Sequence, residues 1–486
     1  MANLSELLPT GGGQNAVDFV ATGTLASGQT VALKADGTVE AVTGVAEGVG
    51  AESVFETSTT GYTASAFDST NNKVVIAYKD EGNSSYGTAV VGTVSGTSIS
   101  FGTPVVFETA NSPYVAATFD STANKVVIAY TDYGNSGYGT AIVGTVSGTS
   151  ISFGSAVVFE AAANTQYNSV TFDSTSNKVV IAYQDVGNSS YGTAIVGTVS
   201  GTSISFGTAV VFNSTSTLWN SATFESATNK IVIAYRNAGN NGYGTSIVGT
   251  VSGTGISFGT AVVFENAASE EIQAVFDANA NKIVIAYHDA GNSFYGTAIV
   301  GTLSGTSISF GTPVVFNAGN TIYIGATIDS TNNKVVIAYR DRANSEYGTT
   351  IAGTVSGTSI SFDTAVVFNA ATTNYVSVCF DSNVNKTVIT YSDNGNSDYG
   401  TSVVLTVAST NLSATTFLGI TSKAISSGAT GAINTYGGIN TAQTGLTIAS
   451  DYYVQSDGSL STASASPAIK VGQAVSATTI NMKDLT

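Results

Sequence analysis

NKVVIAYKDEGNSSYGTAVVGTVSGTSISFGTPVVF, residues 72–107, decides the fold of this chain because six near copies of it follow. The tyrosine that ends the apolar run NKVVIAY recurs at intervals of 52, 53, 52, 52, 52 and 52 residues. Its positions are Tyr78, Tyr130, Tyr183, Tyr235, Tyr287, Tyr339 and Tyr391. A repeat of about 50 residues is typical of β-propellers, in which each repeat forms one blade.

Each repeat contains four runs of strand-forming residues separated by turns. The first, as at residues 114–119, is rich in small residues, which suits the crowded axis of a propeller. The second, KVVIAY at 73–78, is apolar throughout, as expected of a strand covered on both faces. The fourth, at 98–107, carries Pro104, which has no donor for a sheet ladder and therefore favours an outer edge. Seven such units predict an all-β fold with a seven-bladed propeller.

The ends of the repeat array predict how the ring closes. AESVFET, at residues 51–57, matches a fourth strand but has no first three strands before it. The seventh repeat has its first three strands, at 375–407, and then diverges. Because a closed ring leaves no open ends, we expect the strand at 53–56 to complete the seventh blade. The stretch 410–420 is the alternative for this place. The propeller is thus predicted over residues 51–407.

Residues 1–50 and 408–486 lie outside the repeat and share a pattern with each other. TLASGQTVALKADGTV in the first segment resembles TIASDYYVQSDGSL in the second. Both place Asp-Gly between short strands, which is a strong hairpin signal. We expect the two segments to form one β-rich anchoring domain, into which the propeller is inserted.

Composition limits the partners that this chain can have. Only 10% of the residues are charged, but the net charge is −17, so binding to a phosphate backbone is not expected. The start has neither a basic region nor an apolar core of a signal peptide, and no apolar run is long enough for membrane insertion. The single cysteine, Cys379, cannot form an internal disulfide bond.

The two terminal segments resemble terminal modules of tailed-phage virion proteins. The residues that carry the resemblance are MANLSELLPTGGGQN at the start, and FLGITSKAISSGATGAI and VGQAVSATTI near the end. Similar modules occur in decoration, head-fibre and tail-appendage proteins, such as those of marine cyanophages. The resemblance implies a structural component of the virion, assembled in the host cytoplasm and held to capsid or tail proteins by its terminal domain.

The same resemblance implies that the propeller is displayed for attachment to the host surface or to glycan, with several copies associated as a homo-oligomer. The alternatives are a purely structural decoration protein without a ligand and a glycan-cleaving depolymerase. No known reaction and no cofactor are implied, and we expect a protein that is not an enzyme.

Propeller geometry predicts which residues face outward. Loops between second and third strands share one face with the loops that join a fourth strand to the next first strand, and the terminal domain is expected at the opposite face. The residues at the entry to the first strands form a predicted ring around the channel mouth: Tyr62, Tyr114, Tyr167, Trp219, Glu271, Tyr323 and Tyr375. Aromatic side chains suit sugar rings, so these are candidate glycan-binding residues. The alternative is that they only cap the channel.

The repeats differ most in blades four to six. Arg236, His288 and Arg340 follow the repeated tyrosine there, and Arg342 is nearby. They predict an asymmetric pocket for an anionic or hydroxylated ligand; the alternative is drift among exposed loops. The arginines do not indicate a sialidase, because the Asp-box pattern of that family is absent. His288 has no second ligand at a metal-like spacing, so neither catalytic residues nor a metal site are expected.

Overall fold

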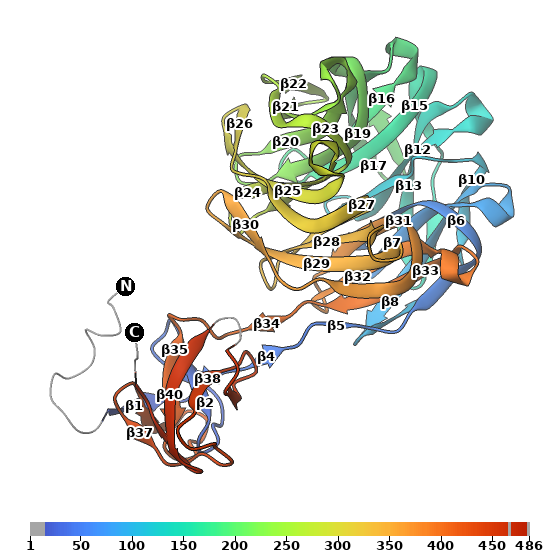
Figure 1. Cartoon of the computed structure of the whole chain (residues 1–486). Helices are drawn as coiled ribbons and strands as arrows, with labels where there is room; N and C mark the ends of the chain where they lie inside the picture. The colour runs from blue at the N-terminus through green and yellow to red at the C-terminus, as the bar shows by residue number, and fades with distance from the viewer. Residues whose placement is uncertain (1–14, 465–467, 484–486) are drawn as a thin grey trace. The chain divides into compact units, whose positions relative to one another are not determined.

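The computed structural model describes residues 15–464 and 468–483. Strands dominate it, and Figure 1 shows them arranged as sheets around a central axis in the propeller, which spans Val49–Thr406. The described residues on either side of this range form a second, smaller unit. The predicted all-β class with a seven-bladed propeller is confirmed. No helix within the described ranges is long and apolar enough to cross a membrane.

The two central strands of every blade follow the repeat closely. The second strands are β7 (Lys73–Asp80), β12 (Lys125–Asp132), β16 (Lys178–Asp185), β20 (Lys230–Asn237), β24 (Lys282–Asp289), β28 (Lys334–Asp341) and β32 (Lys386–Asp393). The third strands are β8 (Tyr86–Ser95), β13 (Tyr138–Ser147), β17 (Tyr191–Ser200), β21 (Tyr243–Ser252), β25 (Tyr295–Ser304), β29 (Tyr347–Ser356) and β33 (Tyr399–Thr406). The apolar run of each second strand is buried on both faces, because blades cover it from both sides.

The outer strand of one blade continues into the inner strand of the next, whereas the sequence predicted two separate strands. The continuous strands are β6 (Ser53–Asp68), β15 (Val157–Asp173), β19 (Val210–Glu225), β23 (Val262–Asp277), β27 (Val314–Asp329) and β31 (Val366–Asp381). Only between the first two blades is this strand divided, into β10 (Val105–Asn111) and β11 (Ala116–Asp120). Pro113 lies in the division, where a residue without an N–H group cannot extend the ladder.

A second break falls within the predicted fourth strand, at residues 102–104, which include Pro104. The outer edge therefore begins with short strands: β9 (Ser98–Phe101), β14 (Ser150–Phe153), β18 (Ser203–Phe206), β22 (Gly255–Phe258), β26 (Ser307–Phe310) and β30 (Ser359–Phe362). At this break the next blade lies close, because the carbonyl oxygen of Thr149 would be 1.8 Å from a Cβ atom on Gly102. Glycine thus lets the turn of the next blade approach this strand closely.

Strand pairing shows how the propeller closes. In the seventh blade, Ser402 of β33 lies opposite Ser53 of β6, and Thr401 lies opposite Val54. Figure 1 shows β6 beside β33, with the short β5 (Gly48–Val49) leading toward them. The other candidate, residues 410–420, belongs to the smaller unit. The pairing also places Ser53 at the end of the blade opposite the bend at Tyr62.

Buried tyrosines join successive blades. The Tyr130 hydroxyl donates a hydrogen bond to the Glu108 carboxylate on the outer strand of the preceding blade, at 3.0 Å. The same pair recurs as Tyr78–Glu56, Tyr183–Glu160 and Tyr287–Glu265. In the fourth blade Asn213 takes the acid's place, and the buried Tyr235 hydroxyl has no hydrogen-bond partner. The repeated tyrosine therefore links blades through a charged hydrogen bond at most positions.

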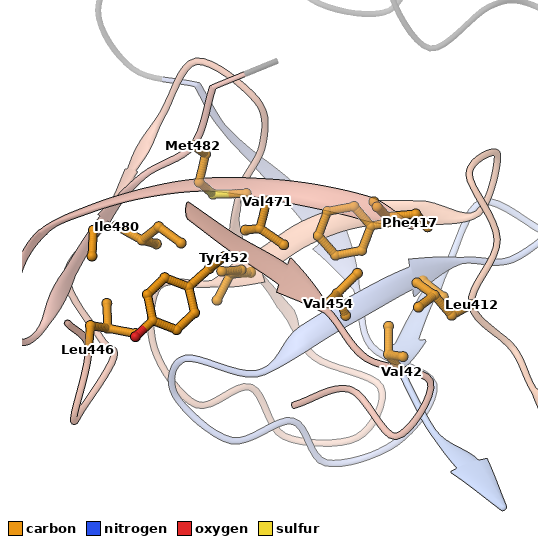
Figure 2. Close-up of a cluster of buried hydrophobic side chains, with 13 residues drawn as sticks. Val42, Leu412, Phe417, Leu446, Tyr452, Val454, Val471, Ile480 and Met482 are labelled. Carbon is orange, nitrogen blue, oxygen red and sulfur yellow. The ribbon is translucent and has the colours of Figure 1, made fainter. Parts of the chain in front are cut away.

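The smaller unit is built from both terminal segments. One sheet has the order β1 (Ala16–Val20), β36 (Thr430–Asn434), β35 (Phe417–Thr421), β2 (Thr30–Leu33) and β3 (Val39–Ala41). The other has the order β37 (Ile439–Asn440), β41 (Thr479–Asn481), β40 (Ile469–Ser476), β38 (Asp451–Val454) and β39 (Leu460–Ser461). A separate pair joins β4 (Gly44–Val45) to β34 (Ser409–Thr410). Figure 2 shows the core, in which Val42 from the first segment packs with Leu412 and Phe417 from the second.

Candidate functional site at the mouth of the central channel

Seven residues form a ring at one mouth of the central channel, and we call them the rim ring. Its members are Tyr62, Tyr114, Tyr167, Trp219, Glu271, Tyr323 and Tyr375. Each lies at the bend where an outer strand becomes the next inner strand, and in the continuous strands the pairing register shifts there. All seven have φ between 49° and 54°, a left-handed conformation that is uncommon for large side chains. The shared backbone conformation thus places these seven side chains at equivalent positions, where all of them line one cavity.

The aromatic members of the rim ring contact one another in sequence. Ring centroids lie 5.0 Å apart for Tyr167 and Trp219, 5.1 Å for Tyr62 and Tyr114, and 5.2 Å for Tyr62 and Tyr375. The remaining neighbours, Tyr114–Tyr167 and Tyr323–Tyr375, are 5.3 and 5.2 Å apart. Burial raises the pKa of all five tyrosines, to about 12 for Tyr375, so their hydroxyl groups stay protonated. The six aromatics therefore form a neutral arc.

Glu271 fills the gap between the two ends of this arc, Trp219 and Tyr323. The backbone N–H of Tyr323 donates a hydrogen bond to the Glu271 carboxylate. Burial, with a smaller effect of the neighbouring Glu270 charge, raises the pKa of Glu271 to about 7. At neutral pH the ring therefore has one acid that is close to the midpoint of its titration.

The rim ring surrounds a cavity of about 400 Å³ that continues into the channel. Asn168, Asn220 and Gln273 line this cavity and also the next one down, whose volume is about 280 Å³. The amide groups of Asn168 and Asn220 donate to the Tyr114 and Tyr167 carbonyl oxygens, at 3.2 and 3.3 Å. Their own Oδ1 atoms are buried and have no hydrogen-bond donor. Asn168 and Asn220 thus place amide groups in the wall below the rim ring.

The arginines of the pocket predicted for an anionic or hydroxylated ligand are paired with acids. Arg236 forms an ion pair with Glu270, and Arg340 forms one with Glu346. Arg342 Nε lies 3.3 Å from Glu346 Oε1. Arg340 also donates to Asn374 in the next blade, at 2.6 Å. Each of these three arginines is therefore paired with a carboxylate of the chain itself, and they do not form a group of unpaired cations for an anionic ligand.

His288 lies behind the rim ring and is buried. Its ring centroid is 5.1 Å from that of Phe294, and its Nδ1 atom is 3.9 Å from Glu270. Neither ring nitrogen has a hydrogen-bond partner, and burial lowers the pKa of His288. His288 thus belongs to the supporting wall. Within the described part of the chain, no three His, Cys, Asp or Glu side chains are placed to hold a metal ion.

The structure brings all seven predicted ring residues to one cavity, with Arg236 and Arg340 immediately outside it. Sequence reasoning missed Asn168 and Asn220. Each directly follows a ring residue, and blade-to-blade comparison shows an amide there in only these two blades. That departure from the repeat is the signal that could have identified them.

Comparison with known proteins supports the fold. No protein-family model and no curated protein sequence matches the chain. Among solved structures, the BP39L lectin from Burkholderia pseudomallei matches with a TM-score of 0.55 and 9% identity, over 73% of this chain and 97% of the lectin. The Aleuria aurantia lectin, solved as a point mutant in complex with Fucα1-6GlcNAc, matches with a TM-score of 0.42 and 14% identity. This match covers 65% of this chain and 98% of the lectin. The likeness to the BP39L lectin is one of fold.

Proposed function

We propose that the propeller binds glycan at the rim ring and does not cleave it. The observation that carries this proposal is that six aromatic side chains and one acid line a single cavity of about 400 Å³, which is within the size range of small-ligand sites. Aromatic groups pack on the apolar faces of sugars, and the neighbouring amides and hydroxyls suit sugar hydroxyl groups. The shared fold with the BP39L lectin is consistent with this use.

Binding without cleavage is favoured by the acids at the rim. Hydrolysis of a glycosidic bond ordinarily requires two carboxyl groups, one of which acts as the acid. Glu271 is open to the cavity, but Glu270 and Glu346 are held in ion pairs with arginines. The site therefore offers one carboxyl group rather than a catalytic pair.

A glycan array probed with the full chain tests the proposal, with Trp219→Ala as the site variant. Tyr133→Ala is the matched control, because Tyr133 is an exposed aromatic residue on the loop after β12, outside the cavity. We expect Trp219→Ala to weaken glycan binding at least tenfold and Tyr133→Ala to leave it unchanged. Equal binding by the two variants, or no binding by the native chain, would favour a second candidate function, in which the rim ring only caps the channel. The packing of the rim side chains against one another supports this second candidate.

We also propose that the chain is a structural component of a phage virion, held there by the smaller unit and present in several copies. The resemblance of the terminal segments to virion modules supports this part of the proposal. Many copies on one particle would convert weak glycan contacts into avid attachment to a host cell. Mass spectrometry of particles purified from a phage lysate would detect the chain at a stoichiometry of several copies per particle; its absence from the particles would overturn the proposal.

A further inference from the structure

The position of Glu271 in the rim ring specifies a kind of ligand. We propose that the cavity binds an ammonium group carried by a surface glycan, held at the gap between Trp219 and Tyr323 by the Glu271 carboxylate. This inference rests on the proposed glycan binding and names the chemical class of the glycan.

The first argument is that Glu271, the acid of the rim ring, has no basic side chain that neutralises its charge. Lys79 Nζ lies 3.0 Å from Glu81, Arg236 is paired with Glu270, and Glu346 takes both Arg340 and Arg342. No basic side chain in the described ranges forms an ion pair with Glu271. Its carboxylate accepts the Tyr323 N–H, and its two oxygens have lone pairs for further donors. An ammonium group supplies both the missing donors and the missing charge.

The second argument is that the surroundings of Glu271 favour cations over anions. The Tyr167 and Tyr323 hydroxyl groups stay neutral because burial raises their pKa. The chain as a whole has a net charge of −17. An anion would meet Glu271 without an unpaired arginine cluster to balance it.

The third argument comes from the aromatic arc. The Lys79 ammonium lies 5.8 Å from the Tyr62 ring centroid, and the Arg340 guanidinium lies 5.9 Å from that of Tyr323, so rim aromatics already have cations of the chain itself near them. With neighbours 5.0–5.3 Å apart, a regular seven-membered ring places its axis about 6 Å from each member, which is the outer limit for cation–π attraction. An ammonium group held by Glu271 at the gap would therefore have Trp219 and Tyr323 on either side and the rest of the aromatic arc across the cavity.

Calorimetric titration of the full chain with three probes tests the inference. The probes are a fully deacetylated glucosamine tetramer, its N-acetylated counterpart and choline, at pH 7.5 and constant ionic strength. The variants are Glu271→Gln, which removes the charge and keeps the shape, and Glu81→Gln, which removes a rim acid that is paired with Lys79. Circular dichroism confirms that each variant is folded.

We expect the native chain to bind the deacetylated tetramer at least tenfold more tightly than the acetylated one. Glu271→Gln should abolish most of this preference and Glu81→Gln should keep it. Competition by choline would extend the site to quaternary ammonium groups, and its failure would restrict the site to primary ones. Equal affinity for the two tetramers, or a preference unchanged in Glu271→Gln, overturns the inference.

The two proposals fail in different ways. Binding of the acetylated tetramer that is lost in Trp219→Ala but unaffected by Glu271→Gln would retain glycan binding and overturn the ammonium site. Binding of choline that depends on Glu271, without binding of either tetramer, would retain the cation site and overturn its assignment to a glycan amine. No binding of any probe would overturn the ammonium site, while the glycan array decides on glycan binding as such.

Discussion

Large side chains in the left-handed conformation are held at the rim ring by packing. Such backbone conformations typically cost about 1–3 kcal/mol per residue. Tyr62 contacts Tyr114 on one side and Tyr375 on the other, and aromatic pairs of this kind contribute about 0.5–1.5 kcal/mol each beyond burial. The aromatic contacts thus offset the cost of the left-handed backbone conformation, and that conformation brings the rings into contact. The sequence predicted which residues form the ring, but it did not predict their conformation, because no glycine or asparagine at these positions signals a positive φ.

Completing the aromatic ring should stabilise the chain. Glu271→Tyr would close the gap between Trp219 and Tyr323 and remove a partly buried acid, so we expect it to raise the free energy of unfolding by about 1–2 kcal/mol. The reverse exchange, Tyr375→Glu, breaks contacts with Tyr62 and Tyr323 and should lower it by a similar amount. Urea unfolding measures both. A Glu271→Tyr variant less stable than the native chain would contradict the view that residue 271 is a gap in a packed ring.

Glu271 should also make stability depend on pH. Its pKa is raised from 4.5 to about 7 in the folded chain, so between these values the folded state binds more protons than the unfolded state. Stability due to this group therefore increases as pH falls from about 8 to about 5. His288 has a lowered pKa and acts in the opposite direction, while Glu270, Arg236, Tyr167 and Tyr323 also face the site.

Comparison with Glu271→Gln isolates the contribution of Glu271. We expect the native chain to gain stability relative to the variant as pH falls over the same range, measured by urea unfolding at each pH. A stability difference that is constant over this range would show that the Glu271 pKa is not raised.

At the scale of the element, the hydrogen bond that links one blade to the next depends on the hydroxyl group of the repeated tyrosine. Tyr130→Phe removes the donor to Glu108 and leaves a partly buried carboxylate without it, so we expect a loss of about 1–2 kcal/mol in the free energy of unfolding. Tyr235→Phe is the matched control, because the Tyr235 hydroxyl is buried without a partner and its removal should be neutral or stabilising. Equal effects of the two substitutions on urea unfolding would show that the hydroxyl bond contributes nothing.

The strands were largely predictable and the contacts between blades were not. The apolar run at Lys73–Asp80 and its copies identified the second strands because burial on both faces leaves a continuous signal. The merging of outer and inner strands was missed because a register shift at Tyr62 has no turn signal in the sequence. A pocket for an anionic or hydroxylated ligand was predicted from Arg236 and Arg340, but the ion pairs that they form with acids 34 and six residues away were not. Only the folded blades bring these charges together.

At the scale of the whole molecule, one strand pair closes the ring. Ser53 and Ser402 lie opposite each other, so the double substitution Ser53→Cys/Ser402→Cys should form a disulfide across the closure. The control Ala89→Cys/Val105→Cys crosslinks the equivalent pair within the first blade and closes a far shorter loop. The loop-entropy relation gives the closure disulfide about 2–3 kcal/mol more stabilisation than the control. Thermal unfolding with and without reductant measures the difference, and a control that stabilises more would contradict closure by this pair.

The single acid in the rim ring, Glu271, bears on how many ligands one chain binds. Seven near-identical blades would offer seven equivalent sites if each blade bound ligand by itself. The proposed site, one per ring and marked by a single glutamate, would instead take one ligand per chain in a defined rotational orientation. On the proposed virion, the number of contacts with a cell would then be set by the copy number of the chain and not by the number of its blades.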